Sequence, residues 1–301
     1  MIKFLTHNEI DKKKWDACID HAYPELPYAY SWFLDEVAPQ WHALVLNDFE
    51  AVMPLPTVKK WFTMAYQPFF VQQLGVYNIN ENPNFEIIDF LTAIPSEYRY
   101  INICLNENNS VYDPSIKTVK RPNYVLHLHQ PFNAIAKGFN NHTKRQIKKS
   151  SLVNSSIEIC NFKDVIFLYQ KELGKETPYI KQEDYSRLIN ICDVLERREM
   201  LECWCIKKDG EITSSAIFIK HRNRLIYYMG ASTETGKENR DMFKIFEFII
   251  KKFAGNNYAL DFEGSEISGV ARFFSGFGAL KLSYQRIIIN RLPFPLNWLK
   301  K

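Results

Sequence analysis

The segment 261–284 gathers the residue types that could do chemistry beside a ligand. It carries three carboxylates and an arginine, namely Asp261, Glu263, Glu266 and Arg272, and four of the chain's eleven glycines, namely Gly264, Gly269, Gly276 and Gly278. Glycine tolerates positive φ and close backbone approach. Because the apolar run 258–260 comes directly before, the pattern predicts a buried strand that opens into a polar, turning loop. Ligand sites in sheet proteins favour such strand ends.

A second feature of chemical interest is the basic stretch 134–150. An apolar or small residue recurs every four positions, at Ile135, Phe139, Thr143 and Ile147, which predicts one stripe of a single helix. Two neighbouring basic rows pair Lys144 with Lys148 and Arg145 with Lys149. They form either a solvated helix face or a phosphate clamp for a nucleotide-linked substrate, CoA or tRNA. No recognition-helix arrangement accompanies them, so we expect no DNA partner.

The elements that must position these residues recur along the chain. The segment 42–55 reads as two strands with a turn at Asn47-Asp48, and 203–217 reads the same way with its turn at Asp209-Gly210, an offset of 161 residues. Three more pairs follow at this offset: 64–66 with 225–227, 85–91 with 246–252, and 124–128 with 285–289. We interpret this register as a tandem duplication of one unit containing an antiparallel meander, a helix and further strands.

The two copies differ where chemistry would take place. The first copy has 106–114 where the second has its glycine-rich segment. In the second copy, apolar residues at helical spacing predict a helix over 241–253, ended by Gly255, and Ser268 is the expected N-cap of a short helix further on. We expect the second copy to be the active one, with an anionic substrate held between the copies.

Composition places the chain among ordinary globular proteins. Of 301 residues, 46% are hydrophobic and 24% are charged, and the net charge is +4. No apolar run is long enough to span a membrane and no signal peptide is evident, so we expect a cytoplasmic protein with six reduced cysteines. His127 and His129 alternate on a strand without a further ligand at metal-binding spacing, so no metal is expected.

The later part of the chain resembles a known family. The strand ending in DFEGS (261–265), the helix RFFSGFG (272–278) and the basic stretch 141–149 are similar to the second half of FemABX-type transferases, over roughly 132–290. The resemblance implies an α+β fold of two tandem GNAT-like domains, an N-terminal one over 1–131 and a C-terminal one over 132–301. It also implies transfer of an acyl or aminoacyl group to an amine. In the peptidoglycan-building members the donor is aminoacyl-tRNA and the acceptor is a cell-wall precursor.

The resemblance also implies which residues form the site. The positions that match family motif positions are Tyr228, Gly230, Asp261, Gly264, Arg272, Phe273, Phe274 and Gly278, and the basic helix adds Lys144, Arg145 and Lys148 as substrate contacts. The Q/RxxGxG/A loop for CoA pyrophosphate is missing, because 231–240 holds a single glycine. A coiled-coil arm for tRNA is missing as well. The donor therefore stays open between acyl-CoA and aminoacyl-tRNA, with no permanently bound cofactor.

Amine attack on an activated acyl group requires a base and donors for the oxyanion. Asp261 or Glu263 could be the base, although Asp261 could instead cap the following helix. Tyr228 either orients substrate or packs in the core, and Arg272 either binds phosphate or pairs with Glu266. An alternative function is a catalytically inactive GNAT fold that binds an anionic ligand. The aromatic and basic tail 291–301 is either an interfacial membrane anchor or packed on the first domain.

Overall fold

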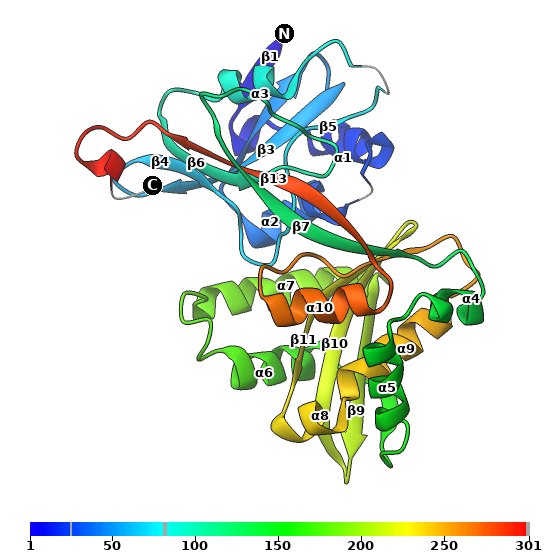
Figure 1. Cartoon of the computed structure of the whole chain (residues 1–301). Coiled ribbons are helices and arrows are strands. Elements are labelled where there is room, and N and C mark those ends of the chain that lie inside the picture. The colour runs from blue at the N-terminus through cyan, green and yellow to red at the C-terminus, as the bar shows by residue number, and fades with distance from the viewer. Residues whose placement is uncertain (25, 81–82, 299–301) are drawn as a thin grey trace. The chain divides into compact units, whose positions relative to one another are not determined.

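A computed structural model of the chain describes residues 1–24, 26–80 and 83–298 (Figure 1). The chain forms two compact units. The first comprises Met1–Arg121 and Ser283–Lys301, and the second comprises Pro122–Leu282. The chain passes from one unit to the other twice, within β7 (Lys117–His127) and within β13 (Leu280–Asn290).

The first unit is built on a mixed sheet with the order β1-β2-β3-β4-β6-β13, and the short β5 pairs with β3. The strands β2, β3 and β4 form the expected antiparallel meander, and β4 and β6 are parallel. The elements of this unit are β1 (Ile2–Leu5), η1 (His7–Glu9), α1 (Lys12–His21), η2 (Pro27–Ala29), α2 (Ser31–Val37), β2 (Trp41–Leu46), β3 (Ala51–Lys59), β4 (Thr63–Tyr66), β5 (Tyr77–Asn78), α3 (Ile87–Ala93), β6 (Tyr98–Cys104) and η3 (Leu296–Trp298).

The second unit has a sheet with the order β8-β9-β10-β11-β12-β7. Its meander is β9, β10 and β11, and β11 and β12 are parallel. Helices α6 and α9 lie on opposite sides of these strands (Figure 1). The elements of this unit are α4 (Phe132–Lys137), α5 (Asn141–Ser150), β8 (Ser156–Ile159), α6 (Phe162–Leu173), α7 (Gln182–Arg197), β9 (Leu201–Lys208), β10 (Glu211–His221), β11 (Arg224–Ser232), α8 (Glu234–Asn239), α9 (Asp241–Phe253), β12 (Ala259–Asp261) and α10 (Ser268–Gly276).

The two sheets confirm the duplication, because their strand orders correspond one to one. The parallel pair β4 and β6 of the first unit corresponds to β11 and β12 of the second. The last strand of each repeat, however, completes the sheet of the other unit: residues 125–127 of β7 pair with β12, and residues 286–290 of β13 pair with β6. The division of the chain therefore differs from the expected single boundary between residues 131 and 132.

A mainly aromatic part of the core of the second unit lies between its sheet and helices α9 and α10. Helix α9 has the bounds predicted from the sequence, and Phe246 on its inner face stacks on Phe262 with ring centroids 5.1 Å apart. Phe274 and Phe277 of the α10 segment belong to the same cluster. Burial of several aromatic rings makes this cluster a large hydrophobic contribution to the second unit.

A buried ion pair ends β12. One carboxylate oxygen of Asp261 accepts a hydrogen bond from Arg224 at 2.7 Å and from the amide of Asn123 at 3.4 Å, while the other accepts from the backbone N–H of Glu263 at 2.8 Å. The side chains of Arg224 and Asp261 are only 9% and 1% exposed. This pair joins the first residue of β11 to the last residue of β12, and it fixes the point at which the chain leaves the strand.

The expected single helix over 134–150 is wrong, since the structure has two short helices there. Gly138, Phe139 and Asn140 separate α4 from α5, and the Asn140 side chain caps α5 by accepting from the Thr143 N–H at 2.8 Å. The separation accommodates the end of α10, because the Asn140 N–H donates to the carbonyl of Gly276 at 2.9 Å. Ser268 is the first residue of α10 and Ile267 is its N-cap, so the expected cap is also wrong.

Replacement of Gly278 by alanine should destabilise the protein. Gly278 has φ of +79°, and an added Cβ would lie 3.0 Å from the Gly138 carbonyl oxygen. We expect Gly278→Ala to lower the free energy of unfolding by about 1–3 kcal/mol. Gly269→Ala is the matched control, because an added Cβ there meets no atom within 4 Å. Urea unfolding checks this, and equal stability of the two variants would contradict it.

Removing one partner of the ion pair between Arg224 and Asp261 should destabilise the protein strongly, and the two effects should be coupled. Arg224→Met and Asp261→Asn each leave a buried polar partner without its counterpart, so each should lower the free energy of unfolding by about 3–5 kcal/mol. The double variant should cost less than the sum of the two. Lys237→Met, which breaks the exposed pair with Glu234, should cost about 0.5 kcal/mol or less. Strict additivity in a urea-unfolding cycle would refute the coupling.

Candidate functional site

The main irregularity of the second sheet is the divergence of its two parallel strands. Strands β11 and β12 pair only from Arg224 to Ile226, opposite residues 259–261. Beyond that point the chain stays with β7 instead, because the Phe262 N–H donates to the Tyr124 carbonyl at 2.9 Å. Strand β11 continues to Ser232, and no described strand pairs with residues 227–232 on the side of β12. Over residues 227–232 the backbone edge of β11 therefore has no strand neighbour on this side within the described part of the chain.

A β-bulge lies where the divergence begins. Met229 pairs with Ile217 and Tyr227 pairs with Phe218, so Tyr228 is the extra residue of β11. Bulges locally disrupt the backbone ladder and often occur beside active sites. The next residue but one, Gly230, has no room for a side chain, since an added Cβ would lie 2.7 Å from the Ser215 carbonyl oxygen.

Tyr228, at the bulge, and Glu263, just beyond β12, are the two residues of chemical interest here. The Tyr228 hydroxyl is buried and has no hydrogen-bond partner among the described residues. Burial, with a smaller contribution from Cys192 and the Glu263 carboxylate, raises the pKa of Tyr228 well above its ordinary value, so the hydroxyl stays protonated. Glu263 is half-buried and has φ of +58°, an uncommon conformation for a residue other than glycine. Such backbone conformations cluster at functional sites.

Asp261 is placed differently from Glu263. Its carboxylate is 1% exposed and both of its oxygens already accept hydrogen bonds, one of them from the Arg224 guanidinium. This geometry is that of a structural anchor between β11 and β12. Glu263, two residues further on, is the more accessible of the two carboxylates proposed from the sequence.

The other residues expected from the glycine-rich segment have different surroundings in the structure. Phe274 is 4% exposed and packs in the aromatic core, and Gly278 permits the close approach to Gly138. Arg272 is exposed on α10, donates through Nε to the Ser268 carbonyl at 3.3 Å, and makes no ion pair with Glu266 in the described chain. Gly264 lies exposed in the loop after β12. Phe273 lines a pocket.

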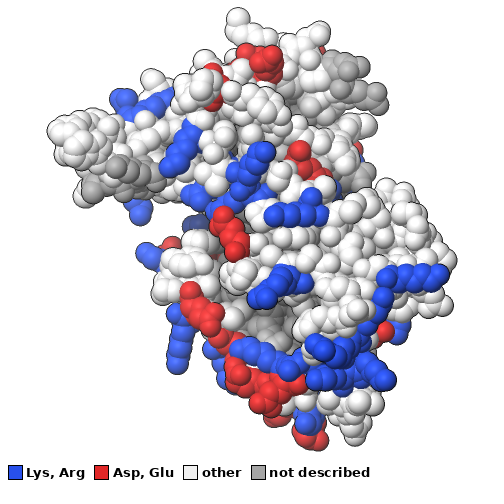
Figure 2. Space-filling model, in the orientation of Figure 1, with Lys and Arg blue, Asp and Glu red and all other residues white. Residues whose placement is uncertain are grey.

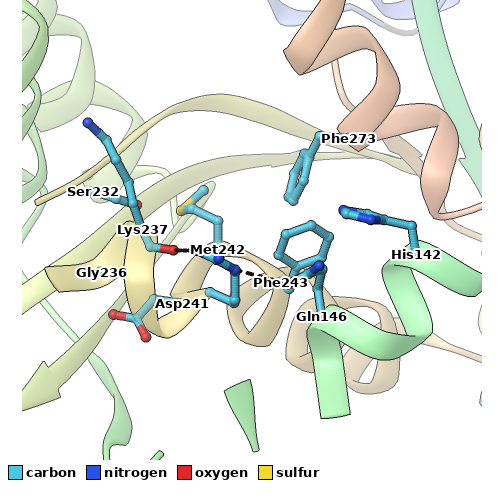
Figure 3. A pocket seen from close by; sticks show the side chains of 10 residues that line it. His142, Gln146, Ser232, Gly236, Lys237, Asp241, Met242, Phe243 and Phe273 are labelled. Atoms are coloured by element: carbon cyan, nitrogen blue, oxygen red, sulfur yellow. Dashed lines mark hydrogen bonds between the residues drawn. The ribbon is translucent and has the colours of Figure 1, made fainter. Parts of the chain in front are cut away.

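This pocket has a volume of about 360 Å³ and lies between α5, α8, α9 and α10. Figure 3 shows His142 and Phe273 directed toward Phe243, whose ring centroid is 6.2 Å from that of His142 and 4.8 Å from that of Phe273. The whole lining consists of His142, Gln146, Ser232, Gly236, Lys237, Arg240, Asp241, Met242, Phe243 and Phe273. The pocket therefore combines an aromatic wall with polar groups from the turn between β11 and α9.

The start of α9 is occupied by the protein's own groups. Arg240 is in the left-handed conformation, and its guanidinium donates to Gln146 Oε1 at 2.9 Å and to the Lys237 carbonyl. Asp241 is 1% exposed, and burial raises the pKa of its carboxyl, against the opposing effect of the Thr213 hydroxyl that donates to it. A CoA pyrophosphate bound on this helix start would meet the Asp241 carboxyl. The residues present do not fit a pyrophosphate here.

The basic residues of α5 form an exposed surface. Lys144, Arg145 and Lys148 are exposed, and no described acidic residue forms an ion pair with any of the three. Lys144 donates to the Lys137 carbonyl at 3.0 Å. Blue side chains gather in Figure 2 over the position that α5 has in Figure 1. The buried side of α5 carries Thr143, Gln146 and Ser150.

Sequence reasoning missed Arg224, Asn123, Gln146, Arg240 and Asp241. A signal existed for Arg224, because an arginine that opens a strongly apolar strand requires a buried acidic partner. Asp241 follows the only glycine of the 231–240 loop by five positions and reads as an ordinary first-turn acid. Its contact with Thr213 joins residues 28 positions apart, so no local pattern indicates it.

Two absences hold for the described residues. Their helices include none that is both long and apolar enough to cross a bilayer. No group of three or more His, Cys, Asp or Glu side chains among them is arranged to hold a metal ion. The rings of His127 and His129 lie 6.2 Å apart.

Comparison with known proteins identifies the fold. No protein-family model and no curated protein matches the sequence. Among solved structures, FemX is similar with a TM-score of 0.65 at 11% identity, covering 99% of both chains. A tandem GNAT protein from the clavulanic acid biosynthesis pathway has a TM-score of 0.55 at 9% identity, covering 97% of this chain and 99% of its own. L-PGS from Bacillus licheniformis has a TM-score of 0.53 at 10% identity, covering 96% of this chain and 94% of its own.

These identities are low, so the similarity concerns the fold. A tandem fold agrees with the two units of this chain, whose strand orders correspond and which each contain one diverging parallel pair. The chain has the α+β fold of tandem GNAT-like proteins, similar to that of FemX.

Proposed function

We propose that the protein is an N-acyltransferase that moves an acyl or aminoacyl group from an activated donor to an amine. The observation that carries this proposal is the divergence of β11 from β12 beside the Tyr228 bulge. A strand edge with unpaired N–H and C=O groups binds an extended, amide-containing substrate by continuing the sheet. The similarity of fold to FemX and to a tandem GNAT protein supports the same class of reaction.

The chemistry requires three roles at this edge. The amine nitrogen attacks the acyl carbonyl, a C–N bond forms, and the C–O or C–S bond to the leaving group then breaks. Glu263 is the candidate base that accepts the amine proton, because its carboxylate is half-buried beside the bulge. Tyr228 is the candidate hydrogen-bond donor to the developing oxyanion, since its hydroxyl stays protonated and has no partner among the described residues. The proton that Glu263 accepts from the amine can then pass to the leaving atom. Asp261 would hold the strands in position through Arg224.

An aminoacyl ester of tRNA is the donor that the surroundings favour over acyl-CoA. The start of α9, where a GNAT enzyme would hold pyrophosphate, already contains the buried Asp241 carboxyl and the engaged Arg240 guanidinium. The exposed cations of α5 instead offer phosphate contacts on an open surface. The acceptor would be an amine on a small or nucleotide-linked molecule, and a cell-wall precursor is the candidate suggested by the resemblance.

A donor comparison tests the proposal. Total tRNA charged with labelled amino acids and a set of labelled acyl-CoAs are each incubated with the protein and an amine-containing metabolite fraction that includes UDP-linked muropeptides. We expect label to move from tRNA to an amine, as measured by mass spectrometry of the product. Transfer from acyl-CoA alone would contradict the donor assignment. Binding of a precursor without transfer from either donor would favour an inactive binding protein.

Loss of either proposed catalytic group should slow turnover without unfolding the protein. We expect Glu263→Gln and Tyr228→Phe each to lower kcat by about a hundredfold, because a positioned general base contributes on the order of 10²–10⁴ and an oxyanion donor on the order of 10²–10³. Glu266→Gln and Tyr258→Phe are the controls. The first removes a carboxylate from the same loop as Glu263, and the second removes a tyrosine hydroxyl just before β12. Kinetics at saturating donor are the measurement. Full turnover in both site variants would exclude these roles.

The cations of α5 should dominate tRNA affinity. Replacing Lys144, Arg145 and Lys148 together by glutamine should weaken tRNA binding and reduce the slope of log K against log salt by about 2–3. The control replaces the exposed Lys163, Lys171 and Lys175 of the α6 region, an equal change in charge. Filter binding at several salt concentrations distinguishes the two, and equal slopes would remove α5 from the tRNA surface.

A further inference from the structure

We propose that the first unit contains a second ligand site, which binds a phosphate or carboxylate group attached to a planar ring. The site is a pocket of about 420 Å³ where β4 leaves β6. Its lining comprises Tyr66, Gln67, Pro68, Phe69, Phe70, Val71, Asn102, Cys104, Arg121 and Arg286, all of them in the first unit. The proposal does not depend on the transferase activity proposed for the second unit.

The pocket exists because a strand pair separates and then rejoins. Strand β4 pairs with β6 as far as Tyr66, opposite Asn102, and the two chains meet again only at the bridge between Leu74 and Leu105. Between these points, residues 67–73 leave the sheet as a loop, with Phe70 at φ of +62°. Main-chain pairing is therefore interrupted over this stretch.

The side chain of Gln67 holds this interruption open in a defined shape. Its Oε1 accepts from the Cys104 N–H at 2.9 Å, and its Nε2 donates to the Val71 carbonyl at 3.0 Å. The amide thus replaces the missing strand contact on one side and holds the loop on the other. A loop fixed in this way can form a preorganised pocket wall.

The charge of the pocket is positive. Arg286 lies opposite Cys104 in the pairing of β13 with β6, and its Nε donates to Asn102 Oδ1 at 2.6 Å. That contact orients the guanidinium, and no acidic partner of Arg286 occurs among the described residues. Burial raises the pKa of the Cys104 thiol to about 11, against the opposing effect of the Arg121 and Arg286 charges. Both guanidiniums therefore lie near this thiol.

The ten lining residues include no Asp or Glu. A half-buried guanidinium held by one neutral hydrogen bond retains further N–H donors in a planar fork, which matches the oxygens of a phosphate or carboxylate. This side of the pocket would therefore bind a phosphate or carboxylate group of a ligand.

The other wall is aromatic. Tyr66 packs against Tyr100 with ring centroids 5.5 Å apart, which fixes its plane, and Phe69 is 40% exposed. Phe70 is also part of the lining. Flat aromatic surfaces beside a cation favour a ligand that carries a ring next to its anionic group. The corresponding strand pair of the second unit also diverges, so both repeats use the same interruption of the sheet.

Calorimetric titration of the full chain with four probes tests the site. Phenyl phosphate and benzoate carry both features, inorganic phosphate carries the anion alone, and benzyl alcohol carries the ring alone. We expect phenyl phosphate or benzoate to bind at one equivalent and more tightly than inorganic phosphate, with no binding of benzyl alcohol. Which of the first two binds more tightly distinguishes a phosphate ligand from a carboxylate. No binding of either at millimolar concentration would overturn the proposal.

Variants assign the binding to this pocket. Arg286→Gln should weaken binding of the better probe by about tenfold or more, as expected for a charge-assisted hydrogen bond. Arg286→Lys retains the positive charge without the planar guanidinium and should weaken binding of that probe several-fold. This variant preserves the test if Arg286→Gln is unstable. Arg99→Gln, an exposed arginine of β6 outside the pocket, should leave it unchanged. Phe69→Ala should lower the affinity for the ring-bearing probe to that for inorganic phosphate. Equal affinity of all Arg286 variants would refute the site.

Discussion

The buried ion pair between Arg224 and Asp261 is the constraint on which the second unit depends. Two charges with side chains 9% and 1% exposed are stable only when they are paired and hydrogen-bonded, so the first residue of β11 and the last residue of β12 must remain together. The chain then turns away with β7 at Phe262. One interaction thereby both closes the parallel pair and sets where it opens.

Everything proposed for catalysis lies just beyond this point. The unpaired edge of β11, the Tyr228 bulge and Glu263 are all within a few residues of the pair in sequence. An active site needs groups held rigidly on a scaffold, and a buried salt bridge with two further hydrogen-bonding partners, Asn123 and the Glu263 N–H, supplies that rigidity. In the proposed mechanism Asp261 therefore positions the strands, and Glu263 is the base.

The duplication gives the molecule two versions of the same interruption. In the first unit, Gln67 fills the gap between β4 and β6 and two arginines line the resulting pocket. In the second, no described side-chain amide is seen to bridge the gap between β11 and β12, and we propose that an extended ligand pairs with the edge of β11. The first copy, which sequence reasoning treated as the less specialised one, therefore has a distinct pocket of its own.

Local patterns in the sequence determined the repeat, the bounds of α9 and the position of the glycine-rich segment, because periodicity and turn residues act over short distances. They did not determine the break between α4 and α5, the exchange of β7 and β13, or the partner of Asp261. Those depend on contacts between residues far apart in the chain: Asn140 with Gly276, Arg286 opposite Cys104, and Arg224 with Asp261. Only the tertiary structure decided them, because burial selects among partners that no local spacing distinguishes.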